Sequence, residues 1–241
     1  MTYKFQTPAI FLIGPTASGK TETSLRLAEE FPLEIISVDS AMVFKEMNIG
    51  TCKPSLQNLE NVPHHLIDIL QPDAEFDVGI FIRYVDSAIQ TIIQNKKIPL
   101  FVGGTMMFHK VLLDGIHDFP RDDSLREEID QIRRNKGYQL LLNELELLDP
   151  ETFQLIDKKN PRRVQRALEI IKLTKTKLSL LKKEPSKKFL NSENCLILGM
   201  NDSKNNLDIS VEKRLRSIIE DGLVNELEKL INTYKLTSES H

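Results

Sequence analysis

The sequence predicts an α/β fold: a core with a parallel sheet, interrupted by an inserted all-helical domain. Up to residue 120, short apolar runs alternate with segments of helical period. From residue 121 to residue 188 the patterns are helical only, and an apolar run returns afterwards. We therefore expect residues 1–120 and 189–241 to form the core, and residues 121–188 to form the inserted domain.

A glycine-rich motif connects the first predicted strand, residues 9–13, to the first predicted helix, residues 21–31. It fits the pattern G-x-x-x-x-G-K-[ST], and its residues are Gly14, Pro15, Thr16, Ala17, Ser18, Gly19, Lys20 and Thr21. Backbone N–H groups of such a loop converge on an anion at a helix N-terminus, so we expect a P-loop NTPase-like core. Lys20 would reach the outer phosphate oxygens, and the Thr21 hydroxyl would help to hold Mg²⁺. The loop alone does not say whether the phosphates belong to a nucleotide.

Residues 34–40 predict a second buried strand, which ends in the polar pair Asp39-Ser40. Ligands of open α/β sheets lie beyond the carboxyl ends of the strands, so we expect Asp39 beside the P-loop. Its carboxylate could hold Mg²⁺, act as a base or cap the next turn, and spacing alone does not decide among these roles.

Residues 41–76 predict a loop with short helical pieces, because glycine and proline recur there. The loop contains the pair His64-His65, which could serve as metal ligands or as a base. No third ligand is evident nearby, so we favour a structural role for both. Residues 77–97 then show helical period with one apolar face, which predicts a core helix.

Residues 98–102 predict the third strand, and a Gly-Gly-Thr sequence ending at Thr105 turns away from its carboxyl end. The glycines permit a tight turn, and we expect the Thr105 hydroxyl to face the same cleft as Asp39. A short helix is predicted at residues 106–115. We expect its apolar side chains in the core: Met106, Met107, Phe108, Val111 and Leu112.

Three helices are predicted in the inserted domain, at residues 123–136, 138–148 and 160–173. The third has Asn160 as its N-cap and Pro161 at its first position. Its apolar stripe consists of Val164, Leu168 and Ile171. Three arginines lie mainly off the stripe and are expected to share a surface: Arg162, Arg163 and Arg166. After the insertion, residues 195–200 predict a strand and residues 210–234 an amphipathic helix that Gly222 could break.

Composition and charge restrict the classes of function. The net charge is −3, but residues 157–188 hold 12 basic and 3 acidic residues, which form either a solvated face or a surface for nucleic-acid phosphates. No window is apolar enough to cross a membrane and no signal peptide is evident, so we expect a cytoplasmic protein without a membrane partner. We also expect a monomer. Cys52 and Cys195 have no metal-ligand spacing and are expected to be reduced thiols.

Five sequence blocks occur in one order: GPTASGKT at 14–21, ISVDSAMVFKEMNIGT at 36–51, PHHLIDI at 63–69, VGGT at 102–105 and NPRRVQRALE at 160–169. Together they resemble the tRNA dimethylallyltransferases, which transfer a dimethylallyl group to N6 of adenosine 37, next to the anticodon of tRNA. The match extends over about residues 9–232. The resemblance implies a P-loop core with an inserted helical domain, as predicted above. It also implies that the phosphates belong to dimethylallyl diphosphate rather than to ATP.

The resemblance implies roles for individual residues. Asp39 would take the proton of the adenine N6 amine as it attacks C1 of the isoprenoid, with Thr105 orienting the reacting groups. Lys20, Thr21, the loop amides and Arg214 would neutralise the departing diphosphate, together with Mg²⁺. The residues in contact with the tRNA anticodon stem-loop would be Asp39, Ser40, Ala41, Met42, Thr105, Arg126, Arg162, Arg163, Val164, Gln165 and Arg166.

The sequence departs from the pattern of that family in three places. Ser210 stands where an arginine is usual one turn before Arg214, and Phe108-His109 stands where a Tyr-Phe pair is usual. The chain ends at His241, before further basic and aromatic motifs of the family, so we expect a C-terminally shortened core. Two alternatives therefore stay open: a shortened tRNA-binding remnant with weak or no activity, and a P-loop small-molecule kinase.

Overall fold

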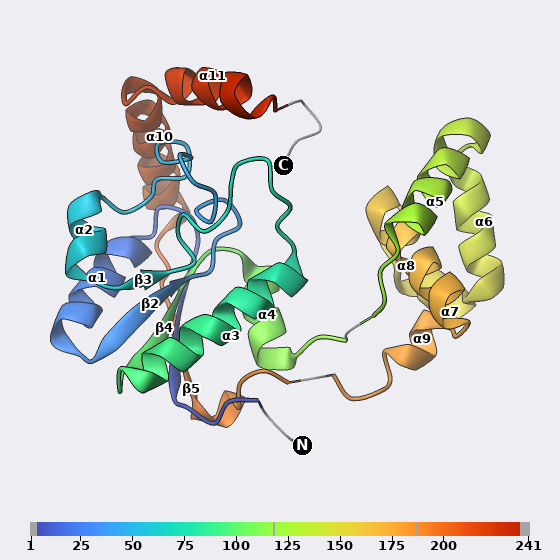
Figure 1. The fold of residues 1–241 in the computed structure, drawn as a ribbon, viewed down its shortest axis with the longest axis horizontal. Coiled ribbons are helices and arrows are strands. Elements are labelled where there is room, and N and C mark those ends of the chain that lie inside the picture. The colour runs from blue at the N-terminus through green and yellow to red at the C-terminus, as the bar shows by residue number, and fades with distance from the viewer. Residues whose placement is uncertain (1–3, 118, 187, 237–241) are drawn as a thin grey trace. The chain divides into compact units, whose positions relative to one another are not determined.

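The computed structural model describes residues 4–117, 119–186 and 188–236. The chain divides into two compact units, each of which is described here by itself (Figure 1). The core unit comprises Met1–Asp114 and Lys188–His241, and the helical unit comprises Gly115–Lys187. Among the described residues, no helix is both long enough and apolar enough to cross a membrane.

A parallel sheet of five strands forms the centre of the described core unit, in the order β3-β2-β4-β1-β5. The strands are β1 Ala9–Ile13, β2 Leu33–Ser37, β3 His64–His65, β4 Ile98–Gly103 and β5 Cys195–Gly199. β1, β2 and β4 consist mainly of Ile, Leu, Val and Phe and are largely buried, as strands covered on both faces must be. The prediction of an α/β core with a parallel sheet is confirmed.

The core unit contains six of the described helices, and helices pack on both faces of its sheet. The six are α1 Lys20–Glu30, α2 Leu56–Asn61, α3 Val78–Gln94, α4 Met106–Asp114, α10 Lys204–Glu220 and α11 Leu223–Tyr234. α1 packs on one face, where Leu25 and Ala28 join the cluster around Leu12. α3 and α4 pack on the other face, where the rings of Phe81 and Phe108 stack with centroids 4.1 Å apart. Packing on both faces leaves the carboxyl ends of the strands available for a ligand.

Some predictions of element type and bounds in the core unit are wrong. The second strand, predicted over residues 34–40, ends at Ser37, so Asp39-Ser40 lies beyond it. The pair His64-His65, placed in a loop, forms the edge strand β3, because its backbone pairs with β2. The last helix begins at Lys204, six residues earlier than predicted, since Ser203 caps it by accepting the Asn206 N–H at 3.2 Å. The break predicted near Gly222 is confirmed: this residue has a φ of 101° and separates α10 from α11.

The prediction of core positions in α4 is partly wrong. Phe108 and Leu112 are buried, but Met106 and Met107 are more than half exposed. The buried positions of α4 are Phe108, His109 and Leu112, so one narrow stripe faces the sheet. The two methionines form the first turn of the helix and lie off this stripe.

The helical unit has its own apolar core. Its helices are α5 Asp123–Lys136, α6 Tyr138–Leu148, α7 Pro150–Leu155, α8 Pro161–Thr174 and α9 Leu178–Leu181. The core contains Ile129 of α5, Leu145 of α6 and Leu168 of α8, all 1 % exposed or less. Asn160 caps α8 through its side chain, as predicted. α7 and α9 were not predicted from the sequence.

Asp149 joins three parts of the helical unit. Its carboxylate is fully buried and accepts hydrogen bonds from the backbone N–H and hydroxyl of Thr152, at 3.1 and 2.7 Å, and of Ser179, at 2.9 and 2.8 Å. Burial alone would raise the pKa of Asp149, but the hydrogen bonds from Ser179 and Thr152 outweigh it and lower the pKa to about 2. The charged carboxylate therefore stabilises the connections before α7 and α9.

We expect Asp149→Asn to lower the free energy of unfolding at pH 7 by about 2 kcal/mol. Because the folded pKa lies below the unfolded value, the contribution is present above about pH 4 and is lost as the pH falls towards 2. Urea unfolding followed by circular dichroism at several pH values measures both effects, with the exposed Glu146→Gln as control. Equal stability of Asp149→Asn and wild type at pH 7 would contradict the assignment.

Candidate active site

The P-loop follows β1 and ends at the first turn of α1. Gly14 lies so close to the segment after β5 that a Cβ atom would stand 2.6 Å from the carbonyl oxygen of Met200. Gly19 precedes α1 with a φ of 82°, a left-handed conformation that favours glycine. The two glycines of the motif are therefore required by the backbone path of the loop.

Two side chains of the P-loop are suited to an anion. Lys20 Nζ donates to the carbonyl oxygens of Gly14 and Pro15, at 3.0 and 2.6 Å, so the ammonium group lies within the loop. Burial and the nearby charge of Arg214 lower the pKa of Lys20, while the negative charge of Asp39 partly offsets this shift. The Ser18 hydroxyl oxygen is buried and has no hydrogen-bond partner. An unpaired buried hydroxyl beside a lysine fits a phosphate oxygen.

A cavity of about 390 Å³ opens beside the P-loop. It collects most of the residues that the sequence predicts for the phosphate site and its surroundings: Thr16, Ala17, Ser18, Gly19, Lys20, Thr21, Asp39, Met42 and Arg214. Gly14 and Pro15 belong to the loop without lining the cavity. The predicted proximity of Asp39 to the P-loop is therefore observed.

Asp39 lies two residues beyond the end of β2. Its Oδ1 atom accepts the backbone N–H groups of Ala41, at 2.8 Å, and Met42, at 3.2 Å. Asp39 thus caps the turn that follows, one of the three roles open from the sequence. Both bonds use a single carboxylate oxygen, and the residue also lines the cavity, so capping is compatible with chemistry there.

The turn after β4 approaches β2 closely. A Cβ atom on Gly103 would stand 2.1 Å from the carbonyl oxygen of Val38, and Thr105 N–H donates to that same oxygen at 3.3 Å. Gly103 and Gly104 line the cavity, whereas Thr105 is not among its lining residues. The His109 ring is buried below the turn and donates from Nε2 to the Gly103 carbonyl at 3.2 Å. A role of Thr105 in the cavity stays a prediction.

His64 lines the cavity, a position that was not predicted for it. Its Nδ1 atom lies 2.7 Å from the carbonyl oxygen of Val62, which fixes the proton on Nδ1. Burial lowers the pKa of His64, so the ring is neutral at pH 7. Its neighbour His65 contacts the buried Glu34 at 2.7 Å. Both rings thus have structural contacts, as predicted for the pair, and His64 lines the cavity in addition.

Arg214 of α10 brings a second positive charge to the cavity. Two hydrogen bonds hold its guanidinium group: Nε donates to Cys52 Sγ at 3.0 Å and Nη2 to the Thr51 carbonyl at 3.5 Å. Cys52 and Cys195 are free thiols, as predicted. Among the described residues, no group of three or more His, Cys, Asp or Glu could hold a metal ion by itself.

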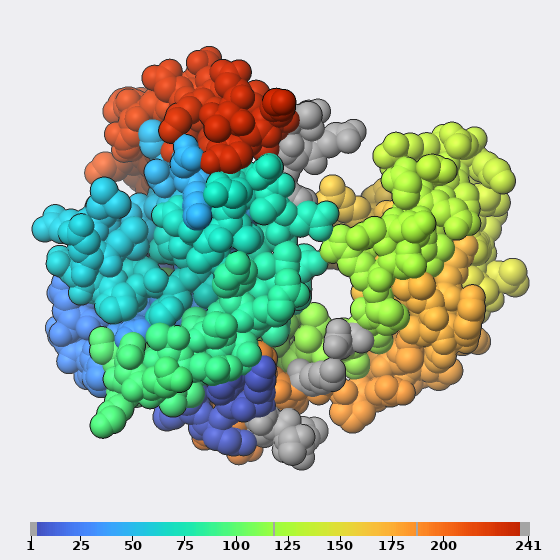
Figure 2. Space-filling view, viewed as in Figure 1, coloured from blue at the N-terminus to red at the C-terminus, as the bar shows by residue number. Residues whose placement is uncertain are grey.

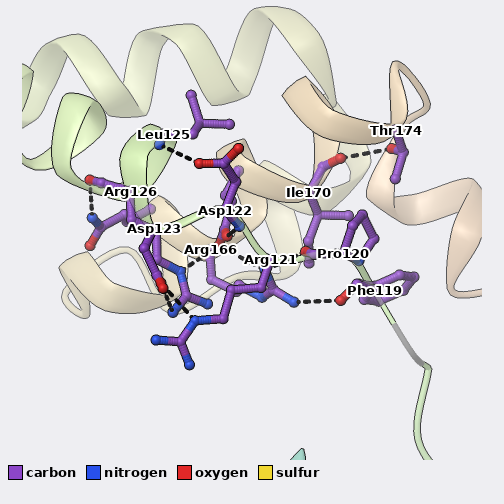
Figure 3. Close-up of polar contacts among 12 residues, drawn as sticks. Phe119, Pro120, Arg121, Asp122, Asp123, Leu125, Arg126, Arg166, Ile170 and Thr174 are labelled. Atoms are coloured by element: carbon purple, nitrogen blue, oxygen red, sulfur yellow. Dashed lines mark hydrogen bonds and ion pairs between the residues drawn. The ribbon is translucent and has the colours of Figure 1, made fainter.

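The basic residues of the helical unit have a structural role in addition to any binding role. Glu169 is fully buried and pairs with Arg126 at 2.9 Å and with Arg166 at 2.7 Å. Arg166 also donates to the carbonyls of Pro120, at 2.8 Å, and Phe119, at 3.1 Å (Figure 3). About a third of each of these two arginine side chains is exposed. Arg166 anchors the segment before α5 and Arg126 connects α5 to Glu169, while part of each side chain stays accessible.

The other predicted contacts on α8 differ in exposure. Arg162 and Arg163 are exposed, and Arg163 lies 3.9 Å from Asp157. Gln165 donates to the Arg126 carbonyl at 2.8 Å. Val164 is fully buried in the core of the helical unit, and its contact with tRNA stays a prediction. Its burial confirms the apolar stripe that the helical period predicted for this helix.

Comparison with known proteins identifies the family. Residues 42–241 match the family described as IPP transferase. The chain belongs to the IPP transferase family. It is 40% identical over 224 residues to tRNA dimethylallyltransferase 2 of Geotalea uraniireducens, covering 92% of this chain and 72% of the relative. It is 38% identical over 232 residues to the tRNA dimethylallyltransferase of Thiobacillus denitrificans, covering 96% and 74%.

Solved structures agree with this assignment to the IPP transferases. The tRNA isopentenylpyrophosphate transferase of Bacillus halodurans is similar with a TM-score of 0.62 and 33% identity, over 94% of this chain and 71% of that one. A eukaryotic dimethylallyltransferase acting on tRNA is similar with a TM-score of 0.81 and 27% identity, over 95% and 57%. The resemblance stated from the motifs and the predicted P-loop-type fold are confirmed.

Proposed function

We propose that this chain is a tRNA dimethylallyltransferase, which transfers the dimethylallyl group of dimethylallyl diphosphate to N6 of adenosine 37 in tRNA. The observation that carries the proposal is that Lys20, Arg214 and Asp39 line one cavity. The two cationic side chains can bind the negatively charged diphosphate. The carboxylate can accept the proton that the attacking amine must lose. The family membership and the names of its relatives support the same activity.

The proposed reaction is an alkylation with a charged leaving group. The N6 amine attacks C1 of the isoprenoid, the bond from C1 to oxygen breaks, and the diphosphate leaves with the bonding electrons. The N6 proton passes to Asp39. Lys20, Arg214 and the P-loop amides stabilise the charge that develops on the diphosphate, because they are already oriented when the bond breaks.

The remaining cavity wall suits the five-carbon chain and the metal ion. Its apolar lining includes Met42, Pro54 and Ile67, a surface on which a branched alkyl group can be buried. The Thr21 hydroxyl is an oxygen ligand of the kind that Mg²⁺ prefers. Mg²⁺ would neutralise part of the diphosphate charge when bound, with phosphate oxygens and water completing its coordination.

The tRNA contact is proposed for the helical unit as well as for the rim of the cavity. Positive charge concentrated between residues 157 and 188, together with the exposed Arg162 and Arg163, suits RNA phosphates. The anticodon loop is single-stranded, so drawing adenosine 37 out of its stack costs less than opening a duplex. We further propose that the protein acts in the cytoplasm and as a monomer.

A transfer assay tests this function against its alternatives. With labelled dimethylallyl diphosphate, Mg²⁺ and unmodified tRNA, we expect label in tRNA, and less label as salt is raised. Binding of tRNA without label transfer would favour the shortened remnant. ATP hydrolysis or phosphate transfer that is lost in Lys20→Ala would favour the kinase. AMP offered together with tRNA should not compete as acceptor, because a free nucleotide lacks the contacts that tRNA makes with the basic surface of the helical unit.

A further inference from the structure

Three consecutive backbone N–H groups of the core unit converge on one carboxylate. Glu226 Oε2 accepts from Asn48 and Ile49, both at 2.8 Å, and Oε1 accepts from Gly50 at 3.0 Å. Consecutive amides that point to one spot form an anion-binding concavity, and hydrogen bonds to an ionised acceptor are stronger than neutral ones. Glu226 of α11 therefore fixes the backbone of this loop, although the two are far apart in the sequence.

The approach of the loop to α11 is close and has further contacts. A Cβ atom on Gly50 would stand 3.0 Å from the Leu223 side chain, so glycine permits the contact. Before the loop, the Glu46 carboxylate pairs with Lys229 at 2.9 Å and accepts from the Tyr234 hydroxyl at 2.6 Å. In Figure 2 the surface of α11, in red, adjoins the blue surface of the segment around residues 45–50.

The same loop continues directly to the diphosphate cavity. Cys52 N–H donates to the Ile49 carbonyl at 3.0 Å and Lys53 N–H to the Asn48 carbonyl at 3.1 Å, so the loop is compact. Thr51 and Cys52 then supply the acceptors that hold Arg214, and Pro54 lines the cavity itself. A short path of backbone and hydrogen bonds thus connects Glu226 with the guanidinium in the cavity.

We propose that Glu226 is a positioning residue for diphosphate binding: it orders the loop at residues 48–53, and this loop holds Arg214 towards the cavity. The inference rests on the proposed function, because it takes the diphosphate as the ligand of Arg214. Without the carboxylate, three amides lose their acceptor and the loop gains freedom. Arg214 then has no fixed partner at Cys52 and Thr51, so more conformational freedom is lost when the diphosphate binds.

The test compares Glu226→Ala and Glu226→Gln with wild type by titration calorimetry, using inorganic pyrophosphate and Mg²⁺ as the probe. We expect the Kd for pyrophosphate to rise about 10-fold in Glu226→Ala and less in Glu226→Gln, which keeps one acceptor oxygen. In the transfer assay the KM for dimethylallyl diphosphate should rise by a similar factor, while the KM for tRNA stays unchanged. Glu228→Ala is the control, because Glu228 is an exposed glutamate of the same helix.

A double-mutant cycle with Arg214→Ala separates positioning from general destabilisation. If Glu226 acts through Arg214, adding Glu226→Ala to Arg214→Ala changes the pyrophosphate Kd by less than about 2-fold. Additive effects, or a wild-type Kd in both Glu226 variants, would overturn the inference alone. Should the alanine variant fail to fold in a thermal melt, the glutamine variant carries the same comparison. A wild-type protein that binds no pyrophosphate would overturn the proposed function, and this inference with it.

Discussion

Replacing Asp39 by asparagine is expected to lower kcat for dimethylallyl transfer about 10²–10⁴-fold, the range for removal of a general base. Asparagine keeps an oxygen that can accept the Ala41 and Met42 N–H groups, so the turn after β2 is preserved. It cannot take a proton from the N6 amine. Single-turnover transfer to tRNA measures the effect on chemistry separately from product release.

Asp39→Ala provides the comparison that distinguishes capping from catalysis. Alanine removes both the acceptor and the base, and loss of such a cap costs about 1 kcal/mol of stability. If Asp39 is the base, Asp39→Asn and Asp39→Ala should lose similar amounts of turnover. If Asp39→Asn instead transfers at the wild-type rate while Asp39→Ala is impaired, the residue only caps the turn, and the proposed proton transfer is wrong.

The P-loop and the place of Asp39 beside it could be predicted from the sequence because their determinants are local. The motif itself fixes the loop that carries Lys20, and the burial of β2 places Asp39 at the carboxyl end of a parallel strand. The reason that Gly14 must be glycine is not local: the carbonyl of Met200, far away in sequence, occupies the space of a side chain. No pattern within residues 14–21 carries that information.

Other parts of the site could not be found by periodicity. A two-residue strand has no alternation to detect, so the position of His64 on the cavity wall was missed. The role of Arg214 was predicted from the family resemblance alone. Nothing in the sequence around an arginine on an amphipathic helix indicates that it contacts Cys52, which is distant in the sequence. α7 is different, because Asp149 followed by Pro150 is an N-cap followed by a first-position proline, and this signal was available.

Replacing Lys20 by alanine is expected to lower kcat/KM for dimethylallyl diphosphate about 10²–10³-fold, as removal of one oriented donor to a developing charge does. The ammonium group lies within the P-loop, between carbonyls of Gly14 and Pro15 and beside the unpaired Ser18 hydroxyl. Alanine removes the charge without adding volume. Lys110→Ala, at an exposed position of α4, is the control for loss of a positive charge elsewhere on the core unit.

Pyrophosphate binding distinguishes the role of Lys20 from that of Asp39. Lys20 acts on the leaving group, so Lys20→Ala should weaken the binding of inorganic pyrophosphate with Mg²⁺ as well as transfer. Asp39 acts on the N6 amine, so Asp39→Asn should lose transfer and bind pyrophosphate nearly as wild type does. Lys20→Met, which keeps most of the apolar stem, should behave as Lys20→Ala if charge rather than packing is responsible. Equal pyrophosphate affinity of Lys20→Ala and wild type would mean that the phosphates lie outside the P-loop.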